Sequence, residues 1–351
     1  MANIPSSQAR PVFTQARIAE YRERARSTSF LRSFFNTDET GEKYLSIEVQ
    51  RGTEKVAVDV QRGTEGNRNS ISKSTEKIFL PPYYHEFLDA TELSLYDRLF
   101  SASGVISGTD LAAFTRELND GLSMLQDKIE RAYELQCSQV LETGIVSLQY
   151  GTNIDFKRKA ASMVDLGAGN YWTTGTVDPR VALGAGANFL RQVGKAQGGT
   201  FNLIMGSDAL NSLLNNAVFK ASADLRRITL EEVRNPQRNS VGGSLHGQVS
   251  AGAYNFNIWT YPEFYDAAGG ASTPYINAKK VIMIPEAPMF KLGFAAVPQI
   301  LTDGGAQTTK GAYIFNDYVD QKKGAHEFDI KSAGVAIPVA VDQIYTFQAI
   351  A

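Results

Sequence analysis

The clearest pattern of apolar and polar positions lies in residues 44–82. Apolar side chains alternate with polar ones over residues 45–49 and again over residues 56–60, which is the period of a strand with one apolar face. Glycine, asparagine and serine are frequent around both runs, and the string Val-Gln-Arg-Gly-Thr-Glu occurs at 49–54 and at 60–65. Because a hairpin of this composition is marginally stable alone, we interpret the segment as an extended arm that packs on another chain.

A longer pattern with helical spacing follows the arm. Ser107 with Asp110 three residues later resembles a capping box, and apolar residues then recur in steps of three and four as far as Val140. Gly144 ends the run. We predict a spine helix over residues 108–143, about 50 Å long at about 1.5 Å per residue. A coiled coil is the alternative, although the charges do not form the regular flanking pairs of one.

The second half of the chain mixes short strand patterns with helical ones, which predicts an α+β fold. Strands are predicted at 145–155, 156–166, 201–205, 256–261, 281–285 and 344–347, with further alternation from 312 to 330. Helices are predicted at 181–195 and 207–216, the second capped by Ser207 and Asp208. Polar, glycine-containing loops are predicted at 235–252 and 266–274.

Length and composition describe an ordinary folded protein. The chain of 351 residues suggests two subdomains or one elaborated domain. Hydrophobic residues make up 43% and charged residues 21%, and the net charge of −2 gives no sign of a polyanion-binding protein. The single Cys137 excludes an internal disulfide framework and indicates a reducing compartment. No apolar run approaches the roughly 20 residues of a membrane span, and residues 1–10 do not resemble a secretion signal.

Charge is uneven along the chain, with a basic excess at its start. Residues 1–35 contain six arginines, against two glutamates, Glu20 and Glu23. One interpretation is a solvated helix with a basic bias. The other is a basic arm that docks on acidic subunits or faces nucleic acid. The arginines are Arg10, Arg17, Arg22, Arg24, Arg26 and Arg32.

Motifs that resemble enzyme sites are weak. Residues 164–169 resemble the first glycine-rich motif of adenosylmethionine-dependent methyltransferases, but that chemistry requires a helix directly after the glycines. The following residues, 170–176, are aromatic and β-branched, so we predict a surface turn. The glycines Gly184 and Gly186 lie inside a predicted helix without the third glycine of a dinucleotide fingerprint, which favours close helix packing.

The histidines do not form a site. His85, His246 and His326 are scattered without ligand spacing, so with one cysteine we predict no structural zinc site. The chain has no nucleophile-elbow pattern, and we interpret His85 as an ordinary polar contact. The sequence therefore predicts no catalytic residues, no cofactor and no metal.

The order of the segments resembles a known family. Three stretches carry the resemblance: residues 30–35 with 42–46, Trp172 with Asp178-Pro179, and residues 326–333 followed by Pro338, Asp342 and Phe347-Gln348. Together they resemble the major capsid protein of tailed phages with the HK97-like fold, and more narrowly the lambda-type major head protein family. The resemblance spans nearly the whole chain.

The resemblance implies a shell subunit with an α+β, HK97-like capsid fold. Hexamers and pentamers would tile an icosahedral capsid around double-stranded DNA. The implied parts are an N-terminal arm (1–43), an extended loop (44–82), a peripheral domain (83–176 and 285–333) that contains the spine helix 108–143, and an axial domain (177–284 and 334–351). Such a bacteriophage protein is located in the virion after assembly in the bacterial cytoplasm.

The same resemblance implies partners. The protein would bind copies of itself, with separate scaffolding, portal and decoration proteins, and would contact packaged DNA without sequence preference. No lysine–asparagine motif for covalent cross-linking is evident. Two alternatives remain open, an encapsulin-like non-viral shell protein and an enzyme with an unrecognised site. The candidate intersubunit contact residues are Phe30, Phe34, Phe35, Arg51, Arg62, Arg68 and Lys73.

Overall fold

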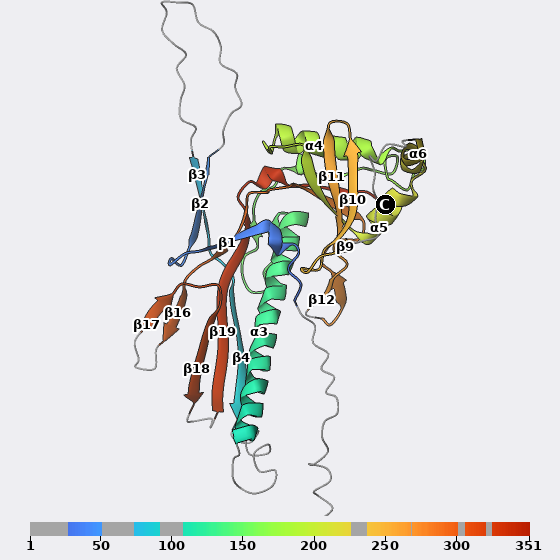
Figure 1. Ribbon diagram of the computed structural model, residues 1–351. Coiled ribbons are helices and arrows are strands. Elements are labelled where there is room, and N and C mark those ends of the chain that lie inside the picture. Colours follow the sequence, from blue (N-terminus) through green and yellow to red (C-terminus); the bar gives the residue numbers. More distant parts are fainter. Residues whose placement is uncertain are drawn as a thin grey trace, which may run out of the picture.

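The structure is a computed structural model that describes residues 27–50, 74–91, 108–225, 237–267, 269–300, 306–320 and 325–351. Residues 1–26 of the basic segment 1–35, the strand pattern at 56–60 and Ser107 of the predicted capping box lie outside these residues. Figure 1 shows a long helix lying against one sheet, with a second sheet and its helices at the C-terminal end of that helix.

The long helix is α3 (Gly108–Glu142), and it confirms the predicted spine helix to within one residue. Gly144 ends it with a φ of +73°, a conformation that other residues rarely adopt. The helix packs on the sheet with its inward face, where the hydroxyl groups of Tyr133 and Ser332 are 2.5 Å apart. No helix in the described part of the chain combines the length and apolar character that crossing a membrane requires.

The first sheet has the order β1-β15-β19-β18, and β4 also pairs with β19. Its strands are β1 (Phe35–Glu39), β4 (Tyr83–Thr91), β15 (Phe290–Phe294), β18 (Ile314–Asp320) and β19 (Ala325–Pro338). β1 pairs with β15 in parallel, and the other pairs are antiparallel. The first part of β19 pairs with β4 and β18 and its last part pairs with β15, so this one strand connects both ends of the sheet.

The second sheet has seven strands in the order β7-β20-β14-β8-β11-β10-β9. They are β7 (Met163–Asp165), β8 (Thr200–Met205), β9 (Gln237–Arg238), β10 (Ser244–Ala251), β11 (Tyr254–Thr260), β14 (Lys280–Pro285) and β20 (Tyr345–Gln348). Three helices, α4 (Pro179–Gln192), α5 (Ser207–Asn215) and α6 (Ala217–Leu225), accompany it. The predicted strands at 201–205, 256–261, 281–285 and 344–347 are therefore confirmed, as is the helix predicted at 181–195.

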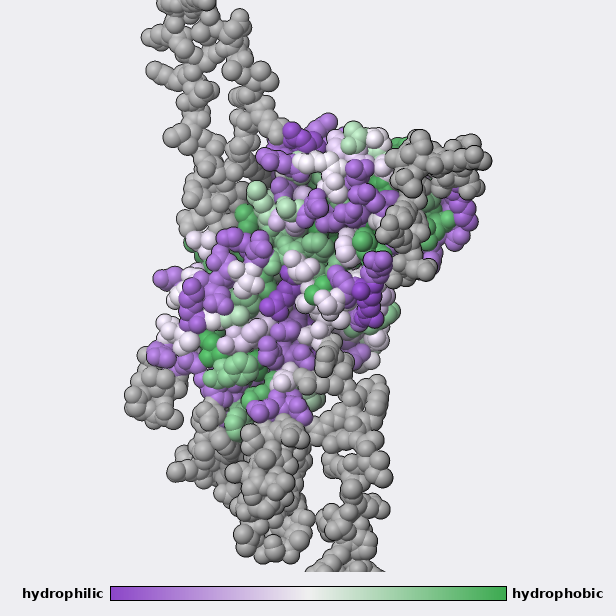
Figure 2. Space-filling view, viewed as in Figure 1, coloured by the Kyte–Doolittle hydropathy of each residue, from purple (hydrophilic) through white to green (hydrophobic). Residues whose placement is uncertain are grey.

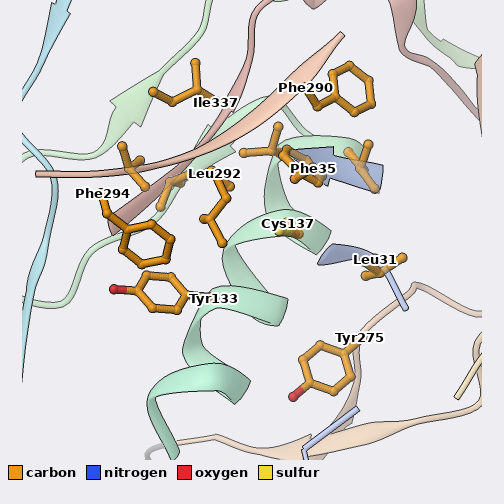
Figure 3. Packing of buried hydrophobic residues seen from close by; sticks show 14 of the residues in the cluster. Leu31, Phe35, Tyr133, Cys137, Tyr275, Phe290, Leu292, Phe294 and Ile337 are labelled. Atoms are coloured by element: carbon orange, nitrogen blue, oxygen red, sulfur yellow. The ribbon is translucent and has the colours of Figure 1, made fainter. Parts of the chain in front are cut away.

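The second sheet separates two hydrophobic cores. In β14, Val281 and Met283 belong to the core shared with α4 and α5, whereas Ile282 and Ile284 belong to the core shared with α3 and the first sheet. Figure 3 shows the second of these, with Tyr133 and Cys137 of α3 facing the aromatic and aliphatic residues of β15. Because both faces of β14 are buried, its sequence is a continuous apolar run without alternation.

Several sequence predictions were wrong in detail. The segment 235–252 is not a loop, since it contains β9 and β10, and 266–274 contains parts of β12 (Phe264–Asp266) and β13 (Ser272–Pro274). Glycines and a register shift between Leu245 and Gly247 interrupt the alternation of β10. The strands expected in 145–166 are shorter, namely β5 (Ile145–Val146), β6 (Ile154–Asp155) and β7.

The predicted cap of α5 was also wrong. Gly206 is the N-cap residue and has no side-chain capping bond, while the hydroxyl of Ser207 donates to Asp208 at 3.3 Å. Asn216 ends α5, and its side-chain oxygen accepts hydrogen bonds from the backbone N–H of Val218 and Phe219 at the start of α6.

Sheet membership differs from the implied domain boundaries at two places. Residues 163–165 pair with β20 of the second sheet, although they fall in the segment 83–176. Residues 334–338 pair with β15 of the first sheet, although they fall in the segment 334–351. Each is a short stretch beside a connection between the sheets, where periodicity carries no information on which sheet a strand joins.

Candidate intersubunit surfaces

The base of the arm is a two-stranded ladder of β2 (Leu45–Gln50) and β3 (Ser74–Phe79). The partner of 45–50 is therefore 74–79, and residues 51–73 lie outside the described residues. Leu45 is buried against Gly293, and Phe79 packs on Phe156 with ring centroids 5.2 Å apart. The base thus rests on its own chain, while Ile78 remains 65% exposed.

The four basic contact candidates of the arm are not tested by the structure. Arg51, Arg62, Arg68 and Lys73 all lie outside the described residues. Their role stays a prediction.

The aromatic contact candidates have partners within their own chain. Phe30 is 2% exposed, and its ring lies 5.4 Å from those of Trp259 and Tyr261. Phe35 is 4% exposed and stacks at 5.1 Å on Phe290. Phe30 and Phe35 are thus covered within their own chain, a distinction that local apolar pattern does not make, and a contact of either with a neighbouring subunit stays a prediction. Phe34 is half-buried, at a ring distance of 5.3 Å from Phe30.

A buried carboxylate anchors this aromatic segment to α3. Glu134 is fully buried and accepts hydrogen bonds from the backbone N–H groups of Leu31 at 2.7 Å and Arg32 at 3.0 Å. Burial raises the pKa of Glu134 to about 7, against the opposing effect of these hydrogen bonds. The hydroxyl of Ser27 adds bonds to Asp127 and Glu130. The sequence signal that could have identified this anchor is a carboxylate on the apolar face of the helix.

One face of the first sheet combines exposed aromatic rings with a buried polar network. Asp329 is 1% exposed and its carboxylate lies 3.1 Å from His85 Nε2, 2.8 Å from Lys331 Nζ and 2.8 Å from Asn316 Nδ2. The interpretation of His85 as a polar contact is confirmed. Tyr83 and Phe87 flank His85 along β4, with ring distances of 6.1 and 6.3 Å.

The exposure of these rings makes this face a candidate contact surface. Tyr83 is 50% and Phe87 59% exposed, and large aromatic side chains are enriched in protein interfaces. Figure 2 shows the molecule in the view of Figure 1, with polar side chains interspersed with smaller apolar groups over the described surface. Scattered apolar groups are normal on a monomer, so the regular row on β4 is the more informative feature.

A buried arginine joins the end of α3 to the second sheet. The guanidinium group of Arg158 donates to the carbonyl oxygens of Leu141 at the end of α3, Ser162 and Ile344, and to the hydroxyl of Thr346 in β20. Burial lowers the pKa of Arg158 to about 10. These partners are carbonyl and hydroxyl oxygens and not a carboxylate, so they balance the positive charge of the guanidinium group only in part. The role of this residue is therefore to hold the end of α3 against β20.

The glycine motifs are structural. Gly167 has a φ of +78°, and the backbone N–H of Asn170 donates to its carbonyl at 2.9 Å, which confirms a turn. A Cβ at Gly186 would lie 2.8 Å from the Tyr345 ring and 2.9 Å from Met283, which confirms close helix packing there. Gly184 has no such neighbour, so that explanation fails for it. The described residues contain no group of three His, Cys, Asp or Glu side chains placed to bind a metal ion.

Solved structures of phage proteins share this fold. A candidate prophage capsid protein of Escherichia coli CFT073 is 13% identical, with 93% of this chain and 94% of that chain covered and a TM-score of 0.63. A phage-related protein of Bordetella bronchiseptica RB50 is 10% identical, with 93% and 94% covered and a TM-score of 0.53. These similarities confirm the HK97-like α+β fold.

Comparison at the sequence level gives one match. The family model described as Phage major capsid protein E matches residues 18–346. No curated protein matches the chain. The matched range includes the aromatic residues of 30–35, the predicted extended loop 44–82, α3 and strands of both sheets.

Proposed function

This chain belongs to the phage major capsid protein E family, and on that premise we propose that it assembles as hexamers and pentamers into a head that encloses packaged double-stranded DNA. As a major capsid protein it forms the icosahedral shell of a virion, and its role is structural and not enzymatic. The single observation that carries the proposal is the family match over residues 18–346.

We assign the parts of the subunit as follows. The first sheet with α3 corresponds to the peripheral domain, and the seven-stranded sheet with α4, α5 and α6 corresponds to the axial domain around each capsomer centre. The ladder of β2 and β3, a separate ribbon in Figure 1, corresponds to the base of the extended loop. When the shell changes size, the arm and the spine helix α3 would rotate as rigid pieces about soft hinges.

We propose that the arm fixes the register between neighbours. Arg51, Arg62, Arg68 and Lys73 would pair with acidic residues of adjacent subunits. A single exposed ion pair contributes about 0–1 kcal/mol, so these pairs would select the correct alignment more than they would add strength. Repetition over many subunits multiplies each small contribution.

The narrower lambda-type relationship is also a proposal. The order of the segments 30–35, 172–179 and 326–333 supports it. This relationship implies separate scaffolding, portal and decoration proteins. It also implies assembly in the bacterial cytoplasm and contact with DNA that does not depend on its sequence. The net charge of −2 agrees with a weak interaction with nucleic acid.

Electron microscopy of the purified full-length protein tests the assembly. Size-exclusion chromatography is expected to give a high-mass fraction, and negative-stain images of it are expected to show closed icosahedral particles. A protein that remains monomeric with and without co-expressed phage head proteins would contradict the proposal.

The content of the particles tests the proposed cargo. Particles from infected or induced cells are expected to protect double-stranded DNA from nuclease. An encapsulin-like compartment would instead enclose a protein, and no observation on the described residues favours that alternative.

A further inference from the structure

Residues 27–39 connect the second sheet to the first sheet across α3, and we call this segment the N-terminal strap. Its last part is β1, which pairs with β15 of the first sheet. Its first part contacts the turn between β9 and β10 and the end of β11, all in the second sheet. Its middle is bonded to α3, and Figure 3 shows Leu31 and Phe35 of the strap beside that helix.

The first part of the strap is seated in a slot of the second sheet. The backbone N–H of Ser29 donates to the carbonyl oxygen of Val241 at 3.2 Å. Phe30 is 2% exposed and its ring lies 5.4 Å from that of Trp259. Gly243 makes room for this ring, because a Cβ at that position would collide with it. This end of the strap is therefore anchored to the second sheet.

The last part of the strap is anchored to the first sheet. β1 pairs with β15 in parallel over the five residues of the strand. Phe35 is 4% exposed and packs on Phe290 at a ring distance of 5.1 Å. The backbone N–H of Thr40, directly after β1, donates to the carbonyl oxygen of Phe294 at 2.8 Å. The two ends of the strap are thus fixed to different sheets.

Between the two anchored ends the chain makes one 3₁₀ turn, η1 (Arg32–Phe34). The backbone N–H of Ser33 lies 3.0 Å from the carbonyl oxygen of Ser29 and 3.2 Å from that of Phe30. Ser33 itself is exposed. A 3₁₀ turn has poorer hydrogen-bond geometry than an α-helix, and water has access to this one. The turn is therefore the least firmly held part of the strap.

An acceptor on α3 holds the start of this turn. The first N–H groups of a helical turn have no partner within the turn, and Leu31, at the N-cap position, makes no side-chain capping bond. The carboxylate of Glu134 takes this role, since its oxygens accept hydrogen bonds from the N–H of Leu31 at 2.7 Å and of Arg32 at 3.0 Å. A displacement of α3 carries this carboxylate away, so the compact form of the strap depends on the position of α3.

The turn shortens the strap. A residue advances the chain by about 2.0 Å in a 3₁₀ helix and by about 3.3 Å in an extended strand. Unwinding of the three residues of η1 would therefore lengthen the strap by about 4 Å. The two sheets would then be able to move relative to each other while both ends of the strap keep their contacts.

Unwinding of η1 is easier than release of either end. Release of the first part would expose the buried ring of Phe30. Release of the last part would break the pairing of β1 with β15. Unwinding breaks only the bonds of a short turn whose central residue, Ser33, is exposed to water. A displacement between the sheets is therefore taken up by η1 first.

We propose that η1 is a releasable element of the N-terminal strap, which unwinds when α3 moves relative to the second sheet and forms again when Glu134 returns. The inference rests on the proposed shell function, in which α3 rotates when the shell changes size. The strap then keeps the two sheets of each subunit connected and limits their separation to the length that the turn releases.

Hydrogen exchange in wild-type shells tests the unwinding directly. Shells of the full-length protein are taken from the compact to the enlarged state with increasing urea, and electron microscopy measures their diameter. The amide groups of residues 31–34 are expected to exchange at least about tenfold faster in the enlarged shell, because the opening is local. The protected amide groups of β1 are expected to stay protected. Equal exchange of residues 31–34 in both states would overturn the proposal.

Ser33 provides a matched pair of variants. Ser33→Ala and Ser33→Gly both remove the bond from the Ser33 hydroxyl to the carbonyl oxygen of Phe30. Glycine is less favourable than alanine in a helical conformation, so Ser33→Gly is expected to favour the unwound form by about two- to fivefold per subunit relative to Ser33→Ala. Its shells are therefore expected to enlarge at a lower urea concentration. Identical midpoints of enlargement for the two variants would count against the proposal.

A second pair controls for general destabilisation. Asn211 is an exposed residue inside α5, away from the strap. Asn211→Ala and Asn211→Gly are expected to differ in the urea midpoint for unfolding of the subunit but not in the midpoint for enlargement of the shell. An equal shift of enlargement in this pair would show that lower subunit stability, and not the strap, causes the effect.

The outcomes separate the strap from the proposed function. Shells that enlarge without faster exchange at residues 31–34 would refute the role of η1 and leave the shell function standing. Shells that keep one diameter until they dissociate would also refute it, because α3 would then have no movement for the strap to follow. Absence of particles from the wild-type protein would instead contradict the proposed function.

Discussion

The carboxylate of Glu134 lies 2.7 Å from the backbone N of Leu31, a residue 103 positions earlier in the chain. This one acceptor orients the turn that buries Phe30 and Phe35 against the body of the subunit. With the bonds of Arg32 and Ser27, this bond attaches the segment that begins at residue 27 to α3. It couples the position of that segment to the protonation of a single group.

The stability of the subunit is expected to depend on pH through Glu134. The folded-state pKa of about 7 lies above the ordinary value of 4.5, so the folded state binds the proton more tightly than the unfolded state does. The contribution to stability is therefore complete below about pH 4.5 and is lost as pH rises through about 7, by an amount on the order of 3 kcal/mol. Denaturant unfolding of the unassembled subunit between pH 5 and 9 measures it.

Glu134→Gln is the matched control for this pH dependence. The amide keeps an acceptor for the N–H of Leu31 but does not ionise, so the decline in stability between pH 5 and 9 is expected to be smaller than in the wild type. Equal slopes for the two proteins would show that another group controls the dependence.

Gly144→Ala is expected to destabilise the subunit by more than about 1 kcal/mol. The φ of +73° is unfavourable for alanine, and the new Cβ would collide with the side chain of Arg158. Gly169→Ala is the control, because nothing lies within 4 Å of a Cβ at that position. Thermal unfolding that is equally affected by both substitutions would contradict this account.

Arg158→Ala is expected to cost about 2–4 kcal/mol of subunit stability. It would leave the carbonyl oxygens of Leu141, Ser162 and Ile344 without this donor, and each unsatisfied buried group costs about 1–3 kcal/mol before relaxation. The neighbouring Lys157→Ala removes an exposed pair with Asp155, which is expected to change stability by about 0–1 kcal/mol. Similar midpoints in urea for the two variants would disprove the role of Arg158.

Reversal of charge on the arm is expected to impair assembly without unfolding the subunit. In the variant Arg62→Glu with Arg68→Glu, the proposed pairs with acidic neighbours become repulsive, so the yield of heads seen by electron microscopy is expected to fall several-fold. Lys157→Glu serves as a control for charge reversal outside the arm, with half the change in net charge, because Lys157 is paired within its own chain. Normal yield and particle stability for the double variant would end the arm-docking proposal.

The predictions that depended on local periodicity of apolar residues were the most accurate ones. The helix α3, the buried strands β8 and β14 and the turn at Gly167 all follow from patterns within a few residues of each other, and the structure has them within one or two residues of the predicted bounds. The irregular strand β10 escaped prediction because its glycines and shifted register remove the alternation on which a strand prediction depends.

The amino-acid sequence alone determined the order of the elements, the α+β class and the resemblance to phage capsid proteins, because these depend on periodicity and on the order of short motifs. Only the tertiary structure decided that β2 pairs with β3, that Phe30 and Phe35 belong to an internal core, and that Glu134 accepts a hydrogen bond from the N–H of Leu31. Each of these is a contact between residues far apart in the chain. The spacing of residues along a sequence does not specify such contacts, since many arrangements of the same elements satisfy the same pattern.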